Sequence, residues 1–403
     1  MNYPTYKLGE VADYINGRAF KPSEWKENGL PIVRIQNLND ESAVYHYSDA
    51  EHEEKYLLHD GDLLFAWAAS LGTYIWNGGE AWLNQHIFKV LPKQNVSKMY
   101  LYYALTSIIK ELYSKSHGSG MVHVTKGKFE ETEIPLPPLS TQHAIVTRIE
   151  TLFAELDKAV QHLRTAQQQL KTYRQAVLNH WLNNDDGKWE MVKLGEVLQK
   201  IEAGKSFRCN EKVPALHEKG IVKISAVTWG EFLEDECKTI INEDLYNPQF
   251  AIHKGDLLIS RANTIQLVGN CVLVRKEPKR NIMLSDKVLR LVISDNVDSD
   301  FILYSLRTSK SRTQIQNMST GNQDSMRNIG QDRIKKIEIP LPPLAEQQRI
   351  VAEIESRLSQ ATASETYIEN ALQQAEALRQ SILKKAFSGE LVVSTGSTTA
   401  NCG

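Results

Sequence analysis

The sequence predicts an α+β protein built by tandem duplication: two globular α+β domains, each followed by a long helix, with the two helices forming an antiparallel coiled coil. Two observations lead to this prediction. A long amphipathic stretch follows Pro137-Pro138 and returns after Pro342-Pro343, displaced by 205 residues. Ahead of each stretch, short apolar runs typical of strands stand beside a longer run with the spacing of a helix.

Length and composition fit this organisation. A chain of 403 residues has room for two or three domains, and its 41% hydrophobic and 24% charged content is ordinary for a soluble globular protein. No apolar run approaches the roughly 20 residues of a membrane-spanning helix, and residues 1–6 show no signal-peptide pattern. The four cysteines include no Cys-x-x-Cys pair, so we expect no zinc site, no disulfide framework and a cytoplasmic location.

The repeat continues inside the globular blocks and sets the expected domain boundaries. Lys7-Leu8-Gly9-Glu10 returns as Lys193-Leu194-Gly195-Glu196, and Gly61-Asp62-Leu63-Leu64 returns as Gly255-Asp256-Leu257-Leu258. The offset grows from 186 to 194 to 205, as expected for one scaffold with loop insertions between shared strands. The expected domains are 1–135 and 188–339, the long helices 136–187 and 340–392, and the disordered tail 393–403.

Within each block the apolar pattern distinguishes strands from helices. Apolar runs after Gly-Asp turns predict buried strands, and apolar spacing near 3.6 predicts one helix per block, followed by a small, flexible stretch. The predicted strands are 63–67, 87–91, 257–260 and 288–293, the predicted helices 99–113 and 301–318, and the flexible stretches 116–120 and 319–322.

Prolines mark the start of each long helix, because proline does not fit inside a helix and pushes the residue before it toward extended geometry. Leu136-Pro137-Pro138 and Leu341-Pro342-Pro343 should therefore be stiff, extended leads. Ser140 or Thr141 is the expected N-cap of the first helix. Ser388-Gly389 is the expected end of the second helix.

Each long helix carries an apolar seam in steps of 3 and 4, held over about five heptads. A solvated single helix has no use for such a seam, so we expect the two helices to pack on each other. Arg174 and Arg379 interrupt the two seams at the same place. The predicted seam residues are Val146, Ile149, Phe153, Leu156, Val160, Leu163, Leu170 and Val177 in the first helix and Val351, Ile354, Leu358, Ile368, Leu372 and Ile382 in the second.

The sequence shows no arrangement typical of an autonomous enzyme. Gly204-Lys205-Ser206 resembles the end of a P-loop, but that motif needs a glycine where Gln199 stands. The 11 histidines show no HExxH or other paired metal spacing. We therefore expect no catalytic residue, no metal and no cofactor in this chain.

Nucleic-acid readout needs only donors, acceptors and cations on loops, and several loops supply them. The first block has 13 Lys and Arg against 17 Asp and Glu, whereas the second has 24 against 20, so the second is better suited to a polyanion. Alternation in Arg34 and Gln36 predicts both side chains on one strand face. For any one candidate the alternative is a solvated strand edge or polar loop. The candidate DNA-binding residues are Arg34, Gln36, Asn37, Gln85, His86, Lys126, Lys128, Lys205, Arg208, Arg261, Asn263, Arg327 and Asn328.

Three motifs occur in a fixed order along the chain. They are Leu136-Pro137-Pro138-Leu139, Leu341-Pro342-Pro343-Leu344 with Glu346-Gln347, and the closing Ala386-Phe387-Ser388-Gly389-Glu390-Leu391. This order resembles the specificity subunit of type I restriction–modification systems, over almost the whole chain. The first copy departs from the pattern at Ser140-Thr141-Gln142, where the glutamate is missing.

The resemblance implies a non-catalytic subunit of a DNA adenine methyltransferase and ATP-dependent endonuclease complex. The two blocks would be target recognition domains that each read half of a bipartite, asymmetric sequence in double-stranded DNA, with the helices as a spacer. The implied partners are two methyltransferase subunits that use S-adenosylmethionine and two restriction subunits that use ATP and Mg²⁺.

Two other functions stay open at the level of the sequence. A stand-alone DNA-binding regulator would bind its site tightly without partner subunits. A coiled-coil adaptor that does not bind DNA would lack the salt-dependent DNA affinity that phosphate contacts produce.

Overall fold

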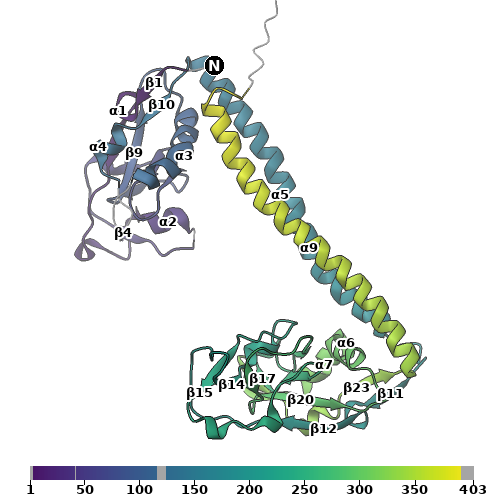
Figure 1. Ribbon diagram of the computed structural model, residues 1–403. Helices are drawn as coiled ribbons and strands as arrows, with labels where there is room; N and C mark the ends of the chain where they lie inside the picture. Colours follow the sequence, from purple (N-terminus) through teal and green to yellow (C-terminus); the bar gives the residue numbers. More distant parts are fainter. Residues whose placement is uncertain (1–2, 41, 116–123, 392–403) are drawn as a thin grey trace, which may run out of the picture. The chain divides into compact units, whose positions relative to one another are not determined.

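The computed structural model describes residues 3–40, 42–115 and 124–391. It divides into two compact units, residues 1–164 with 369–403 and residues 165–368. Each unit holds one domain of mixed sheets and helices together with part of each long helix (Figure 1). The predicted α+β class is confirmed. The stretch 116–120 and the tail 393–403, which we expected to be flexible or disordered, lie outside the described residues.

The first domain contains two four-stranded sheets. One has the order β2-β9-β6-β7 and is antiparallel; the other has the order β4-β3-β8-β5, with β3 parallel to β8. The strands are β2 (Ala12–Asn16), β3 (Leu30–Val33), β4 (His46–Ser48), β5 (Leu57–Leu58), β6 (Leu63–Ala66), β7 (Gly72–Ile75), β8 (Ala81–Leu83) and β9 (Ile87–Pro92). The helices are α1 (Leu8–Val11), α2 (Ile35–Asn39), α3 (Lys98–Lys115) and α4 (Lys126–Glu130).

The second domain repeats this arrangement and adds a small sheet. Its sheets have the orders β12-β20-β16-β18 and β13-β15-β14-β19, with β14 parallel to β19, and β17-β22-β21 is the addition. The strands are β12 (Leu198–Ala203), β13 (Cys209–Asn210), β14 (Lys219–Val222), β15 (Cys237–Ile240), β16 (Leu257–Ser260), β17 (Ala262–Asn263), β18 (Cys271–Leu273), β19 (Asn281–Met283), β20 (Val288–Ile293), β21 (Thr320–Gln323) and β22 (Met326–Asn328). The helices are α6 (Ser299–Arg307), α7 (Ser309–Met318) and α8 (Gln331–Ile334).

The predicted buried strands are confirmed at the centre of each antiparallel sheet. All four residues of β6 and of β16 are buried, because these strands have neighbours on both sides and apolar cover on both faces. A Gly-Asp turn precedes each of them. Gly61 and Gly255 have φ of 85° and 93°, the left-handed geometry that glycine adopts most readily.

A short two-stranded ribbon joins the start of each domain to the strand that leads into its long helix. β1 (Thr5–Lys7) pairs with β10 (Glu133–Pro135), and β11 (Glu190–Lys193) pairs with β23 (Glu338–Leu341). The repeated Lys-Leu-Gly-Glu motif follows the first strand in both copies. The Lys7 backbone N–H donates to Glu10 at 2.8 Å and that of Lys193 to Glu196 at 3.2 Å, which closes the turn.

The two long helices are α5 (Leu139–Leu182) and α9 (Leu344–Phe387), with 44 residues each. The expected cap at Ser140 or Thr141 is wrong, because both residues lie inside the first turn of α5. The Pro138 carbonyl accepts from the Thr141 backbone N–H at 2.9 Å, so the helix begins directly behind the prolines. α9 ends at Phe387, and Gly389 just beyond it has φ of 76°, as is common past a helix C-terminus.

Two other predictions in the second domain are wrong. The expected single helix at 301–318 is two helices, because Thr308 is extended, with φ −63° and ψ 152°, and caps α7 with its hydroxyl. The expected flexible stretch 319–322 is largely strand β21, paired with β22. Among the described residues, no helix is both long and apolar enough to span a membrane.

Both long helices contribute to the core of each unit. In the first unit the core includes Ile145 and Ile149 of α5 and Ile382 of α9. In the second unit it includes Val177 of α5 and Ile354 of α9. Every predicted seam residue is buried or half-buried, whereas most of the residues between them are exposed.

Candidate nucleic-acid interface

In each domain a glycine allows one loop to cross closely over another. A β-carbon on Gly17 would lie 2.0 Å from the Asn84 carbonyl oxygen, and one on Gly204 would lie 1.9 Å from that of Leu284. No side chain fits at either position. The Gly-Lys-Ser sequence that resembles a P-loop is therefore a crossing point between loops.

In the first domain the loop at residues 84–86 meets three other segments at this crossing. The Asn84 backbone N–H donates to the carbonyl of the last residue of β3 at 3.2 Å. That of Gln85 donates to the Arg18 carbonyl at 2.8 Å, and that of Trp67 to the His86 carbonyl at 3.1 Å. We call the residues that these bonds bring together the first loop cluster: Arg18, Arg34, Trp67, Gln85 and His86.

The second domain builds the same crossing from different residues. The Gly204 backbone N–H donates to the Ser285 carbonyl at 3.1 Å, and that of Arg261 to the Lys287 carbonyl at 2.8 Å. Lys223 follows β14 as Arg34 follows β3. We call the residues gathered here the second loop cluster: Lys205, Arg208, Lys223, Arg261 and Lys287.

The second loop cluster is strongly basic. A hollow of about 490 Å³ is lined by two of its residues, Lys223 and Lys287, and also by Lys238, Glu211 and the small polar residues Ser206 and Ser285. The nearby carboxylate of Glu211 is paired with Lys238 at 2.6 Å, and this hydrogen bond lowers its pKa. A basic, concave surface lined by hydroxyls suits a phosphate backbone.

Four cations of this cluster are available for a partner. Lys205, Arg208, Arg261 and Lys287 are exposed, and their side chains make no hydrogen bond or ion pair with any residue in the described ranges. Unpaired cations cost little in water and can neutralise phosphates without first breaking an internal salt bridge.

The first loop cluster is less basic and more aromatic. Arg18 is paired with Glu24, and Trp67 lies edge-on to His86 with the ring centroids 4.9 Å apart. Three polar atoms here are buried without a hydrogen-bond partner among the described residues: Nη1 of Arg18, Nε of Arg34 and Oδ1 of Asn84. Unpaired buried polar groups are costly, and such groups are satisfied by water, an ion or a ligand.

Arg34 and its neighbours differ from the prediction. Arg34 does not alternate with Gln36 on a strand face, because Arg34 precedes helix α2 and Gln36 lies on its exposed side. Asn37 is 4% exposed, and its amide bonds the Arg34 backbone N–H and the carbonyls of Ala43 and Val44. Asn37 therefore serves the fold and is not free to read a base.

Other candidates are likewise used inside the fold. Asn263 donates to the Thr228 hydroxyl at 3.3 Å, and Arg327 donates to the Ser319 carbonyl at 2.8 Å. Lys126 donates to the Tyr14 carbonyl at 2.9 Å. Lys128 and Asn328 are exposed, outside the two clusters as we define them.

The prediction missed Arg18, Trp67, Lys223 and Lys287. A weak signal for two of them, Arg18 and Lys223, was present, because two further repeats run through both domains. Gly17-Arg18-Ala19-Phe20 corresponds to Gly204-Lys205-Ser206-Phe207, and Ile32-Val33-Arg34-Ile35 corresponds to Ile221-Val222-Lys223-Ile224. In both repeats a cation occupies the same position in the two copies.

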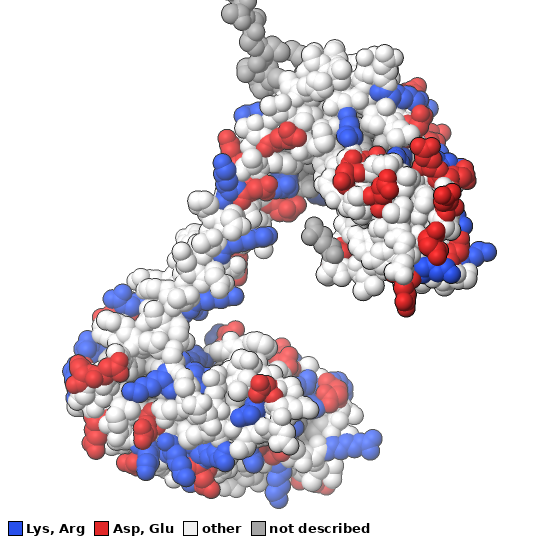
Figure 2. All heavy atoms as spheres, turned by 180° about the vertical axis from the view of Figure 1, so that it is seen from behind, with Lys and Arg blue, Asp and Glu red and all other residues white. Residues whose placement is uncertain are grey.

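On the face seen in Figure 2, surface charge differs between the two domains in the sense that the residue counts predict. Figure 2 shows Asp and Glu side chains gathered on the first domain, and Lys and Arg side chains more frequent on the second. Each domain is thus suited to a different balance of phosphate and base contacts.

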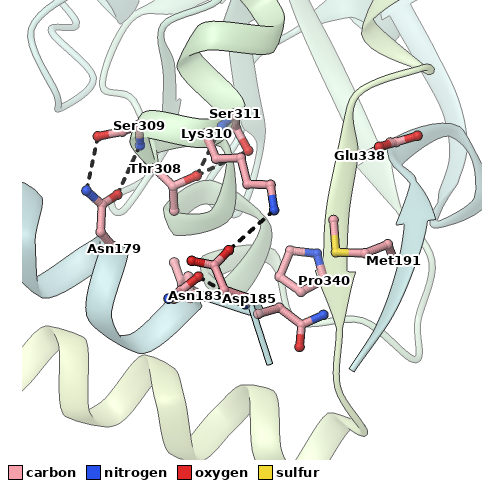
Figure 3. Close-up of a pocket in the computed structure, with 12 residues that line it drawn as sticks. Asn179, Asn183, Asp185, Met191, Thr308, Ser309, Lys310, Ser311, Glu338 and Pro340 are labelled. Carbon is pink, nitrogen blue, oxygen red and sulfur yellow. Dashed lines mark hydrogen bonds and ion pairs between the residues drawn. The ribbon is translucent and has the colours of Figure 1, made fainter. Parts of the chain in front are cut away.

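The end of α5 is fastened to the second domain beside a small hollow of about 270 Å³ (Figure 3). Asn179 accepts from the Ser309 backbone N–H at 3.1 Å and so caps the start of α7. Lys310 lies 3.8 Å from Asp185. Lys310 is thus paired with a carboxylate and the start of α7 is capped, so the residues around this hollow serve to attach α5 to the domain.

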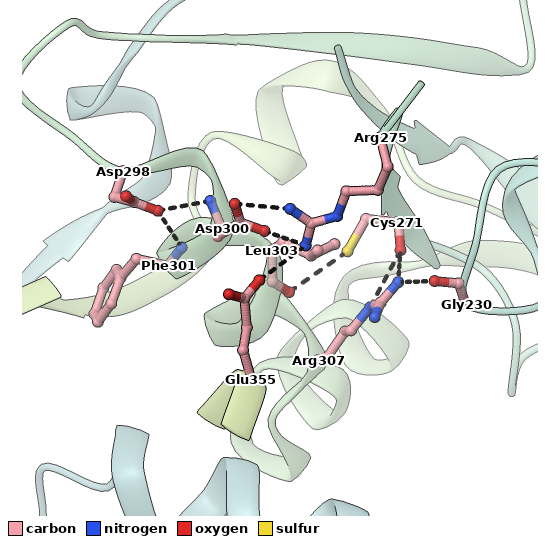
Figure 4. A network of polar contacts seen from close by, with 9 residues as sticks. All are labelled: Gly230, Cys271, Arg275, Asp298, Asp300, Phe301, Leu303, Arg307 and Glu355. Atoms are coloured by element: carbon pink, nitrogen blue, oxygen red, sulfur yellow. Dashed lines mark hydrogen bonds and ion pairs between the residues drawn. The ribbon is translucent and has the colours of Figure 1, made fainter. Parts of the chain in front are cut away.

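A second polar network holds α6 against strand β18 and against α9 (Figure 4). Arg275 donates to Asp300 at 2.9 Å and lies 3.5 Å from Glu355 of α9. Arg307 donates to the Cys271 carbonyl at 2.7 Å. Burial raises the pKa of the Cys271 thiol, as for a structural cysteine.

Arg307 also helps to present an aromatic residue. Trp229 is 67% exposed, and the carbonyls on either side of it accept from Asn270 at 2.8 Å and from Arg307 at 2.6 Å. Its loop also touches Asn263, two residues from Arg261 of the second loop cluster. Exposed aromatic rings on a fixed backbone are used to stack on nucleotides.

Comparisons with known proteins agree with one another. The family model for the type I restriction modification DNA specificity domain matches residues 2–163 and 186–374. The EcoBI type I restriction enzyme specificity subunit of Escherichia coli is 26% identical over 95% of this chain and 85% of its own length. The MjaVIII specificity subunit of Methanocaldococcus jannaschii is 26% identical over 88% of this chain and 86% of its own.

Two solved structures share the fold. A chain from a study of complex assembly and conformational transition of the type I R-M system superposes with a TM-score of 0.72 at 20% identity, covering 97% of this chain and 98% of that one. The HsdS subunit of Thermoanaerobacter tengcongensis superposes with a TM-score of 0.58 at 21% identity, covering 97% of each chain.

Proposed function

Because this chain belongs to the family of type I restriction modification DNA specificity domains, we propose that it recognises DNA through the two loop clusters, each reading half of a bipartite target. Its function is DNA sequence specificity within a type I restriction–modification complex. The domains we assign to reading are 1–135 and 188–339, with spacer helices within 136–187 and 340–392.

The matched loop crossing carries this proposal. Both domains bring loops to the same place in the same fold, yet they fill it with different side chains. A site built twice with different residues is suited to reading two different half-sites. The target is therefore asymmetric.

Phosphate and base contacts divide between the residues as follows. The cations Lys205, Arg208, Arg261 and Lys287 neutralise phosphates, which sets affinity and register. Gln85 of the first loop cluster, and Gln36 two residues beyond Arg34 of that cluster, carry amides that can donate to and accept from one adenine, which is how a glutamine reads a base edge in the major groove.

The spacer helices set the gap between the half-sites. We assign α5 and α9 to an antiparallel coiled coil, supported by the half-buried seam and by the contacts of Arg174 and Arg379 between the helices within the two units. A helix of 44 residues is about 66 Å long at ~1.5 Å per residue. Since half-site separation on DNA follows from the distance between readers, such a pair leaves an unread gap of defined length.

Catalysis belongs to partner subunits in this proposal. The chain itself has no catalytic role; two methyltransferase subunits with S-adenosylmethionine modify adenine, and two restriction subunits use ATP and Mg²⁺. We assign this chain and the DNA that it recognises to the cytoplasm.

Mapping N6-methyladenine across the host genome, with and without this gene, tests the proposal. We expect one split, asymmetric motif to lose its methylation when the gene is deleted, and to regain it on complementation. An unchanged methylation map would contradict the proposal. Tight, site-specific DNA binding by the isolated chain would instead favour the stand-alone regulator, and no salt-dependent DNA binding would favour the adaptor.

A further inference from the structure

Two glutamines occupy matched, fully enclosed positions in the first turn of the long helices. Gln142 and Gln347 are 205 residues apart, the same offset as the Pro-Pro leads. They are 0% and 1% exposed. A glutamine so deeply buried in a helix facing a domain needs partners for its whole amide, because burying it unpaired is costly.

In the first domain Gln142 connects three segments. Its Nε2 donates to the Pro137 carbonyl at 2.9 Å and to the Asn95 carbonyl at 3.0 Å. Its Oε1 accepts from the backbone N–H of Ser97 at 2.8 Å. Ser97 immediately precedes α3, so the first turn of α5 is tied to the start of a core helix of its own domain.

In the second domain Gln347 makes the corresponding bonds. Its Nε2 donates to the Pro342 carbonyl at 2.8 Å, and its Oε1 accepts from the Asp298 backbone N–H at 2.9 Å. Asp298 is the N-cap of α6, which is packed in the domain core (Figure 4). The same side chain therefore makes the same connection twice, although the two domains differ in most other residues.

Directional bonds at this point do what apolar packing does not. A helix cap needs one side-chain bond to its own first turn. In Gln142 and Gln347 the side-chain oxygen instead accepts from the backbone N–H at the start of another helix, and the side-chain nitrogen donates to a carbonyl of the proline lead. An apolar side chain of the same size would fill the space, but it would leave the angle between helix and domain to softer contacts.

We propose that Gln142 and Gln347 are positioning residues that lock each reading domain to its own long helix and so restrict the complex to one half-site spacing. This inference rests on the proposed function. The glutamines touch no DNA and act only through the helix–domain angle. Loosening either one should widen the range of accepted spacings while each half-site is still recognised.

The test uses the complete complex in its host, with methylated adenines mapped across the genome. Gln142→Met and Gln347→Met keep side-chain length and remove the bonds. We expect sites whose gap is one base pair longer or shorter to gain methylation relative to native sites by about tenfold, the ratio that ~1.4 kcal/mol produces. The half-site sequences in the methylated set should stay unchanged.

Two matched controls separate position from stability. Ile350→Val lies one turn further along α9 in the same core and weakens packing without cutting the joint. Asp298→Pro removes both the side-chain cap of α6 and the backbone N–H that donates to Gln347, at a residue whose φ of −78° suits proline. Asp298→Ala removes the cap alone and keeps that N–H. Spacing should relax for the proline variant and not for the alanine variant or for Ile350→Val. If the methionine variants fail to fold, the Asp298 pair decides.

The outcomes are distinct. Unchanged spacing in folded Gln142→Met and Gln347→Met complexes, or in folded Asp298→Pro, overturns the inference. Equal relaxation in Ile350→Val overturns it too, because general destabilisation would then be enough. A wild-type complex that already methylates many spacings would instead overturn the spacer assignment within the proposed function.

Discussion

Arg174 of α5 donates from its Nη2 to Oε2 of Glu365 on α9, at 2.7 Å. The same arginine reaches the Thr362 hydroxyl at 3.1 Å. In the other unit Arg379 of α9 contacts Asp157 of α5. Arg379 lies 205 residues after Arg174, and Thr362 lies 205 residues after Asp157, so the two contacts join equivalent positions. The duplication thus extends to individual polar contacts, and the two interruptions of the apolar seam are where the helices are joined by charge.

These contacts should contribute little stability. Arg174 and Glu365 are about a third exposed, so solvent screens the pair and we expect a coupling of about 0.3–1 kcal/mol. A double-mutant cycle with Arg174→Ala and Glu365→Ala, followed by chemical denaturation, measures it. Coupling above 2 kcal/mol would show that the pair is shielded from water. The matching cycle at Arg379 and Asp157 is the internal comparison.

The second loop cluster should govern the salt dependence of DNA binding. Lys205→Ala and Lys287→Ala should each reduce the slope of log affinity against log salt by about 0.9, the loss expected for one phosphate contact. Titrations of the assembled complex between low and moderate salt measure that slope. Lys310→Ala is the control, because Lys310 faces Asp185 outside the cluster. An unchanged slope for both cluster variants, or an equal change for the control, would place the DNA elsewhere.

The fold was largely predictable because its signals are local. A Gly-Asp turn before an apolar run predicts a buried strand, and β6 and β16 follow that rule. The long helices follow from the proline leads and the heptad spacing. The break at Thr308 lies in a stretch without apolar residues, 307–314, where the spacing gives no signal, and only the cap at that residue separates α6 from α7.

The candidate site was predictable only in pieces. Arg34 and Gln85 were singled out from composition, but their proximity depends on β3 lying parallel to β8 in one sheet, a pairing that no local pattern encodes. Asn37 and Arg327 were indistinguishable from surface residues in the sequence. Their side chains form hydrogen bonds with backbone groups that only the folded chain brings near them.

The glycine at the loop crossing should be intolerant of any side chain. Gly204→Ala places a β-carbon 1.9 Å from the Leu284 carbonyl oxygen, so the loop must move, at a cost of about 1–3 kcal/mol in the free energy of unfolding. DNA affinity of the assembled complex should fall as well, because Lys205 follows this glycine. Gly330→Ala is the control, with no atom within 4 Å of the added carbon. Equal, small effects of both substitutions on thermal unfolding would refute the crossing.

The joint at the start of α9 should weaken in acid. The side chain of Arg349, bonded at 2.8 Å, and Lys188 lower the pKa of Glu346 to about 2. A folded-state pKa below the unfolded value means that the folded protein binds fewer protons, so this stabilisation is present above about pH 4.5 and is lost as the pH falls toward 2. Denaturation across that range should show a smaller loss for Glu346→Gln, which cannot titrate, than for the unmodified chain. An identical acid dependence of the two proteins would mean that the carboxylate has no such partners in solution.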